Sequence, residues 1–83
     1  MVSFRAWKAI TMARLLELKK QYRGNDRAEQ VIDSVIVKLK NLKARDLISL
    51  LDQLHTGSSY VPELLDIVPS PEQVERWVGG ESG

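Results

Sequence analysis

Apolar residues recur at alternating spacings of four and three positions between residues 28 and 42 of this 83-residue chain. The five that set this spacing are Ala28, Ile32, Val35, Leu39 and Leu42. This alternating spacing aligns the five residues along one side of a helix, as in a short coiled-coil-like contact. Val31 and Ile36 widen this apolar side, while Val37 falls on the polar side. We therefore predict a helix that buries one face against its neighbours.

The start of this helix has its own signal. Asp26 and Glu29 have the spacing of a capping box, in which each side chain bonds a backbone N–H that the helix start leaves unpaired. We therefore predict that Asp26 caps this helix.

The apolar pattern changes phase after residue 42. A new stripe of Leu47, Leu50, Leu51 and Leu54 begins one position out of register. We predict a break or kink within residues 41–44, followed by a third helix that ends at residues 55–57. One continuous helix with a phase shift is the alternative.

The first helix is predicted to begin after a capping Ser3, to end near Tyr22 or Arg23, and to stop at Gly24. One side of this helix collects Phe4, Trp7, Leu15, Leu18 and Tyr22. Ile10, Met12 and Leu16 fall outside that stripe. A helix that is apolar on more than one face packs on more than one neighbour, and here one neighbour could be another chain.

Two short helices are predicted beyond Gly57. Pro62 suits the first turn of a helix that Pro69 ends, and Ser70, Pro71 and Gln73 form a strong helix start. Val74, Trp77 and Val78 are expected to point inward from the last helix. We predict an all-α fold, a compact bundle of four to five helices with three longer N-terminal and two short C-terminal ones. It forms a single domain over residues 1–83, with 79–83 as a frayed tail.

Charge is divided between the two halves of the chain. Residues 1–43 hold ten Lys or Arg against four Asp or Glu, a net of +6. Residues 44–83 hold two against seven, a net of −5. Complementary halves suit head-to-tail contact between copies. Alternatively, the two halves neutralise each other within one folded monomer.

The sequence offers little for catalysis or metal binding. It has one histidine and no cysteine, and His55 sits at a predicted helix end, where capping explains it. The carboxylates match no zinc or calcium ligand spacing, and the glycines form no phosphate-binding loop. We expect no enzymatic activity, no metal and no cofactor.

The N-terminus lacks a continuous apolar segment, and charges interrupt every long apolar run. This pattern predicts neither a signal peptide nor a membrane span. A chain without cysteine fits a reducing compartment. We expect a cytoplasmic protein that does not act at a membrane.

The surplus of large aliphatic residues favours a non-enzymatic helical interaction module that acts by self-association or by binding a protein partner. Eleven Leu, eight Val and five Ile are many for a chain of this length. The residues that we expect at the protein interface are Phe4, Trp7, Ile10, Met12, Leu16 and Val37.

The alternative function is nucleic-acid binding through the basic side of the first helix. Residues of this kind neutralise backbone phosphates and give salt-dependent, sequence-independent binding. The candidates for phosphate contact are Arg5, Lys8, Lys19, Arg23 and Arg27. An ordinary solvated helix face would explain the same residues.

Two short segments resemble known families. Residues 42–51, LKARDLISLL, are similar to helices of oligomeric phage DNA-packaging adaptors of the small-terminase kind. That resemblance implies a DNA-packaging adaptor as a variant of the nucleic-acid function, although the separate helix-turn-helix of those proteins is not found here. Residues 70–77, SPEQVERW, are similar to the opening helix of sterile-alpha-motif domains. No functional residue is carried over from either family.

Overall fold

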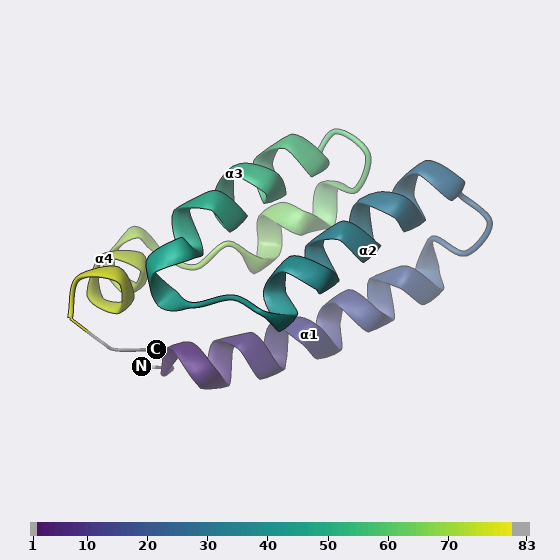
Figure 1. Ribbon diagram of the computed structural model, residues 1–83. Coiled ribbons are helices and arrows are strands. Elements are labelled where there is room, and N and C mark those ends of the chain that lie inside the picture. The colour runs from purple at the N-terminus through teal and green to yellow at the C-terminus, as the bar shows by residue number, and fades with distance from the viewer. Residues whose placement is uncertain (1, 81–83) are drawn as a thin grey trace.

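The computed structural model describes residues 2–80 and is all-α, as predicted (Figure 1). Its α-helices are α1 (Phe4–Gln21), α2 (Asp26–Lys40), α3 (Leu47–Gly57) and α4 (Pro71–Gly79). Two 3-10 segments, η1 (Ala44–Asp46) and η2 (Pro62–Ile67), complete the fold. The predicted break is confirmed, since α2 ends at Lys40 and α3 begins at Leu47. Of the predicted tail, residues 81–83 lie outside the described residues.

The ends of α1 follow the local sequence signals. The Ser3 hydroxyl accepts a hydrogen bond from the backbone N–H of Ala6 at 3.1 Å, which confirms the predicted cap. Beyond the helix, Gly24 has a φ of 93°, a conformation that residues with a side chain rarely adopt. This glycine lets the chain turn sharply into α2.

The cap of α2 corrects the sequence prediction. Asn25, not Asp26, is the cap residue, and its side-chain oxygen accepts from the Ala28 N–H at 3.2 Å. Glu29 still reaches back, but it accepts from the Gly24 N–H at 3.2 Å. Asn25 has extended backbone angles and Asp26 is already helical, so the capping position lies one residue earlier.

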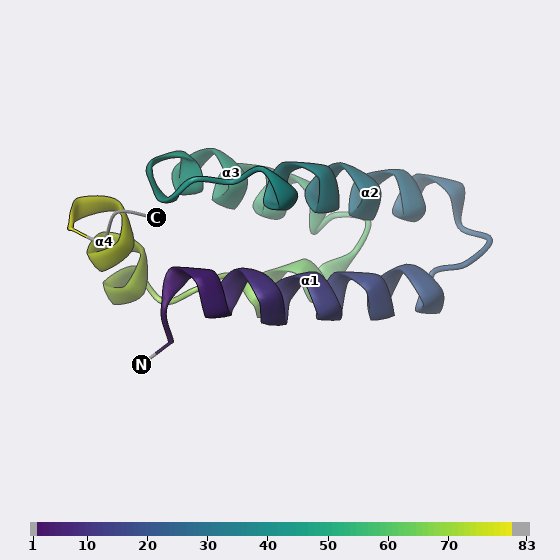
Figure 2. The ribbon, with the colours of Figure 1, turned by 60° about the horizontal axis from the view of Figure 1, so that its bottom comes forward.

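The longer elements line up along one axis of a molecule that measures 41 × 20 × 20 Å. α1 packs on α2, α2 on α3, and α3 on η2. η2 returns beside α1, where the Trp7 indole Nε1 donates to the Ile67 carbonyl oxygen at 3.2 Å. Figure 2 shows α1 on the side of the bundle opposite α3, with α4 across one end.

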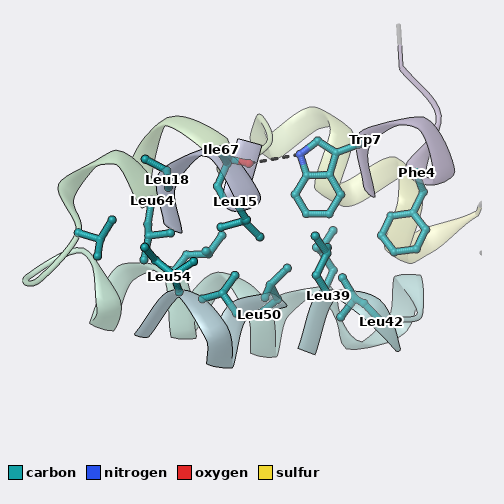
Figure 3. Close-up of a cluster of buried hydrophobic side chains, with 14 of the residues drawn as sticks. Phe4, Trp7, Leu15, Leu18, Leu39, Leu42, Leu50, Leu54, Leu64 and Ile67 are labelled. Atoms are coloured by element: carbon teal, nitrogen blue, oxygen red, sulfur yellow. Dashed lines mark hydrogen bonds between the residues drawn. The ribbon is translucent and has the colours of Figure 1, made fainter. Parts of the chain in front are cut away.

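The core runs the length of the bundle between these elements (Figure 3). All five residues that defined the periodic segment 28–42 are buried in it, as are Leu47, Leu50 and Leu54 of α3. Val37, which was predicted on the polar side of its helix, is 63% exposed. The 3.6-residue period therefore located the buried side of α2 correctly.

Aromatic residues close the end of the bundle that α4 covers. The Trp77 ring lies 5.7 Å from that of Phe4 and 5.6 Å from that of Trp7, measured between centroids. Ser70 caps α4 by accepting from the Gln73 N–H at 3.3 Å. Trp77 is fully buried, but Val78 is 40% exposed and does not point inward as predicted. A helix of nine residues on the rim of the bundle buries only a narrow stripe.

Candidate interaction surface

α1 exposes an apolar surface on the side that faces away from the core. Phe4, Leu15 and Leu18 are buried, whereas Ile10 and Leu16 are 54% and 50% exposed. Two exposed alanines separate them on the helix surface. We define the α1 face as Ala9, Ile10, Ala13 and Leu16. With only small side chains at its centre, the α1 face lets another helix or surface approach closely.

The six residues predicted at the protein interface do not form one surface. Phe4 and Trp7 lie in the core at 4% and 8% exposure, so they are not available to a partner of the folded chain. Met12 is partly buried and packs against the core. Val37 lies on α2, beside the α3 residue Gln53 in a shallow hollow. Only Ile10 and Leu16 belong to the α1 face.

Three of the five residues predicted to contact phosphate are held by contacts within the molecule. The Lys8 ammonium donates to the Leu42 carbonyl oxygen at 2.8 Å and lies 5.6 Å from the centre of the Phe4 ring. Lys8 therefore satisfies a carbonyl just beyond the end of α2.

Lys19 and Arg27 are engaged as well. The Lys19 Nζ lies 2.8 Å from a carboxylate oxygen of Asp33, and that hydrogen bond and charge raise the pKa of Lys19 above 10.5. The Arg27 guanidinium lies 5.2 Å from the centre of the Tyr60 ring. Arg5 and Arg23 are both exposed, and neither has an ion pair, a side-chain hydrogen bond or an aromatic contact within residues 2–80.

The segment that comprises α3 and η2 is acidic and also exposes aliphatic side chains. Residues 47–67 contain Asp52, Glu63 and Asp66 but no Lys or Arg. Ile48 of α3 and Leu65 of η2 are 58% and 48% exposed. Sequence reasoning missed both residues as surface candidates. The signal was present for Ile48, which falls outside the stripe formed by the other leucines of α3.

No ion pair joins the two charge halves in the part of the chain that the structure describes. The two ion pairs found, Lys19–Asp33 and Lys20–Glu17, both lie within residues 1–43. The acidic residues of α3 and η2 therefore do not neutralise the basic helices by direct contact.

His55 lies at the C-terminal end of α3, where its Nδ1 is 2.8 Å from the Leu51 carbonyl oxygen. This contact fits a capping role for the ring.

Among residues 2–80, no group of three or more His, Asp or Glu side chains is arranged to hold a metal ion. No helix in this part of the chain combines the length and apolarity needed to cross a membrane.

One hollow of about 300 Å³ lies between α1 and η2. Its lining residues are Arg14, Glu17, Leu18, Gln21, Glu63 and Ile67. Four of these six carry polar or charged groups, in contrast to the mostly apolar lining of small-molecule pockets.

Comparisons with known proteins give no match: no family model, no curated protein and no solved structure matches this chain. The protein is an all-α helical bundle. Because a fold of this kind does not specify a function, the exposed residues have to indicate it.

Proposed function

We propose that this chain is a helical protein-interaction module that uses the α1 face. One observation carries the proposal: Ile10 and Leu16 are each about half exposed, side by side with alanines, on a helix whose other side builds the core. A protein partner that covered them would gain about 1 kcal/mol for each side chain from burial of the exposed half.

The proposed role is non-catalytic and, since the chain has no cysteine, suits a cytoplasmic setting. Arg5 and Arg14 are exposed on the same helix and make no ion pair within residues 2–80, whereas Lys20 lies 3.9 Å from Glu17. Charges at the rim of an apolar patch orient a partner and speed its approach more than they add affinity. We therefore expect the partner surface to be apolar at its centre and acidic at its rim.

A photo-crosslinking residue at Ala13, in the middle of the α1 face, tests this proposal. The matched control places the same residue at Gln30, which is exposed on α2. The crosslinked adducts are identified by mass spectrometry, both in purified protein and in extract of the producing cells. We expect protein adducts from position 13 and far fewer from position 30. Equal yields from both positions, or no protein adduct from position 13, would refute the proposal.

Nucleic-acid binding is the second candidate, and the exposure of Arg5 and Arg23 is the observation in its favour. Against it, Lys8, Lys19 and Arg27 are engaged within the molecule. We rank protein interaction first for this reason.

A further inference from the structure

We propose that the partner of the α1 face is a second copy of this chain, bound through its acidic side at α3 and η2, so that copies associate head to tail. This inference rests on the proposed function of the α1 face. It adds the identity of the partner, the surface that the partner presents and the symmetry of the contact.

The geometry of η2 places Leu65 on a different side from the residues that face α1 and the core. In a 3-10 helix, side chains three positions apart share one side. Glu63 turns toward α1, where its carboxylate accepts from the Tyr22 hydroxyl, and Asp66 shares that side. Leu64 and Ile67 fill the core. Leu65 is on the third side and is 48% exposed.

Ile48 lies on the side of α3 that is turned away from α2. Ser49 and Gln53 line hollows that they share with Val37 and Lys38, and so they mark the side of α3 toward α2. Ile48 leaves α3 on the other side, and so does Leu51, which is partly buried against the core. α3 thus exposes Ile48 on the side away from α2, with Leu51 and His55 at helical spacing beside it, and η2, which packs on α3, exposes Leu65.

The same two elements also expose acidic residues. Asp52 of α3 and Asp66 of η2 are both exposed, and no Lys or Arg lies within residues 47–67. We define the α3–η2 face as these two aspartates with Ile48, Leu51 and Leu65. The α3–η2 face combines apolar and acidic side chains, as we expect of the surface that binds the α1 face.

The charges of the two elements are complementary. α1 carries five Lys or Arg against one Glu, a net of +4, and residues 47–67 carry a net of −3. Complementary potentials of this kind steer two copies together and orient them. Arg5 and Arg14 of α1 make no ion pair within residues 2–80, and neither do Asp52 and Asp66, so these exposed charges are available for this contact.

The same charges disfavour symmetric contacts. An α1 face against an α1 face would bring together two helices that each carry a net charge of +4. An α3–η2 face against itself would oppose Asp52 and Asp66 to their equivalents. The two faces also consist of different residues on different elements, and α3 lies on the side of the bundle opposite α1 (Figures 1 and 2). The contact is therefore heterologous, and it builds an open chain of molecules or a closed ring.

Two variants of the full chain, each with one blocked face, test the inference. Leu16→Asp blocks the α1 face, and Leu65→Lys blocks the α3–η2 face. We measure solution mass by light scattering at low and high salt, at protein concentrations up to about 1 mM, the range of weak contacts. Wild type is expected to associate beyond the dimer at low salt and to dissociate at high salt. Each variant alone is expected to bind itself at least about tenfold more weakly.

The decisive step is to mix the two variants. One intact α1 face and one intact α3–η2 face are then available, so the mixture should form a one-to-one heterodimer that grows no further. Val37→Ser is the matched control, since Val37 is exposed on α2 outside both faces, and it should associate like wild type. Circular dichroism checks the fold of each variant, and Leu16→Ser and Leu65→Ser replace any charged variant that fails to fold.

Three results would overturn the inference. Undiminished self-association of Leu65→Lys, with loss only in Leu16→Asp, would show a symmetric α1 contact. A mixture that forms no heterodimer would exclude the pairing of the two faces. A wild type that is monomeric at about 1 mM and low salt would exclude self-association. If wild type is monomeric, crosslinks from position 13 to a different protein would still support the proposed interaction function. If position 13 then gives no protein crosslink at all, both the proposed function and the self-association inference are wrong.

Discussion

The Tyr22 hydroxyl donates a hydrogen bond of 2.6 Å to the carboxylate of Glu63, and so ties the end of α1 to η2, 41 positions later in the chain. This bond stabilises the ionised form of Glu63, so the pKa of that carboxyl lies below its ordinary value of 4.5. It equally favours the protonated phenol, and the pKa of Tyr22 is raised above 10.0. η2 is a 3-10 segment of six residues, and this bond helps to hold it beside α1.

The Tyr22–Glu63 bond should make stability depend on pH in both directions. Because the pKa of Glu63 is lowered on folding, its contribution is complete above 4.5 and is lost as the pH falls through the lowered pKa. Because the pKa of Tyr22 is raised, its contribution is complete below 10.0 and is lost as the pH rises through the raised pKa. Tyr22→Phe should therefore unfold at lower urea than wild type near neutral pH, and the difference should shrink at both extremes.

Tyr60→Phe is the matched control for this experiment. Tyr60 is exposed, and within residues 2–80 its hydroxyl makes no hydrogen bond. Its urea midpoint should follow wild type at every pH. A Tyr22→Phe difference that stays constant from acid to alkaline pH would contradict the assigned role of the Tyr22–Glu63 bond.

The two tryptophans should respond differently to replacement by phenylalanine. Trp7→Phe removes the donor to the Ile67 carbonyl oxygen and leaves that buried acceptor unpaired, a loss of about 1–3 kcal/mol. The Trp77 indole nitrogen is buried and finds no partner among the described residues. Trp77→Phe removes an unsatisfied donor, and this offsets part of the packing that is lost.

Urea denaturation of the two variants, monitored by circular dichroism, compares their free energies of unfolding. Trp7→Phe should be the less stable of the two. An equal or larger loss for Trp77→Phe would show that its indole nitrogen is satisfied in solution.

Gly57, the last residue of α3, lies close to Val31 of α2 and Leu64 of η2. A methyl group added there would lie 2.8 Å from Cγ1 of Val31 and 2.9 Å from Cδ1 of Leu64. Gly57→Ala should therefore lower the free energy of unfolding by about 1–3 kcal/mol through overpacking. Gly79→Ala is the control, because nothing lies within 4 Å of its added carbon, and it should be neutral or stabilise α4 by up to about 1 kcal/mol. Chemical denaturation of both variants checks this, and a neutral Gly57→Ala would mean that the contact relaxes freely.

The contacts of Lys8 decide which basic residues can test nucleic-acid binding. Lys8→Met keeps most of the aliphatic stem but loses the bond to the Leu42 carbonyl oxygen, at a cost of about 1–2 kcal/mol. Lys20→Met should change stability by less than about 0.5 kcal/mol, because the Lys20 side chain is 78% exposed and its ion pair is 3.9 Å long. Thermal unfolding of both variants tests this. Equal effects would mean that the Lys8 bond adds nothing to stability.

Arg5→Glu combined with Arg23→Glu therefore tests nucleic-acid binding without disturbing the fold. The measurement is the fluorescence anisotropy of a labelled duplex titrated with protein at low and moderate salt. We expect wild type to bind no more tightly than about 10⁻⁴ M near physiological salt, the weak end of non-specific binding. A tighter, steeply salt-dependent affinity that the double variant loses would favour the nucleic-acid function over the protein interface.

Local patterns predicted most of the secondary structure. Ser3 and Ser70 are cap residues as expected, and the spacing from Ala28 to Leu42 identified the buried side of α2. The cap of α2 was misplaced by one residue because Asn25 and Asp26 have equally suitable side chains. Only the backbone angles of the turn after Gly24 decide between them.

The candidate surface was only partly predictable. Ile10 and Leu16 were assigned correctly as apolar residues outside the main stripe, but Phe4 and Trp7 were assigned to the interface although they are buried. Their burial depends on α4, which brings Trp77 against both rings from more than 65 positions away in the chain. Helical periodicity gives the direction of a side chain around its own axis and contains no information about which distant element covers it.

The sequence by itself determined that this chain is helical, where most of its helices begin and end, and that its charge is divided between two halves, because caps, breaks, periodicity and composition act over a few residues. The tertiary structure decided which apolar residues stay exposed and which basic residues are engaged. Lys8 donates a hydrogen bond to Leu42, 34 positions away, and Trp7 donates one to Ile67, 60 positions away. Both bonds form only because the helices pack into a bundle. Contacts between distant segments arise from the packing of whole elements. That packing also decided which apolar side chains stay exposed, among them Ile10 and Leu16 of α1, Ile48 of α3 and Leu65 of η2.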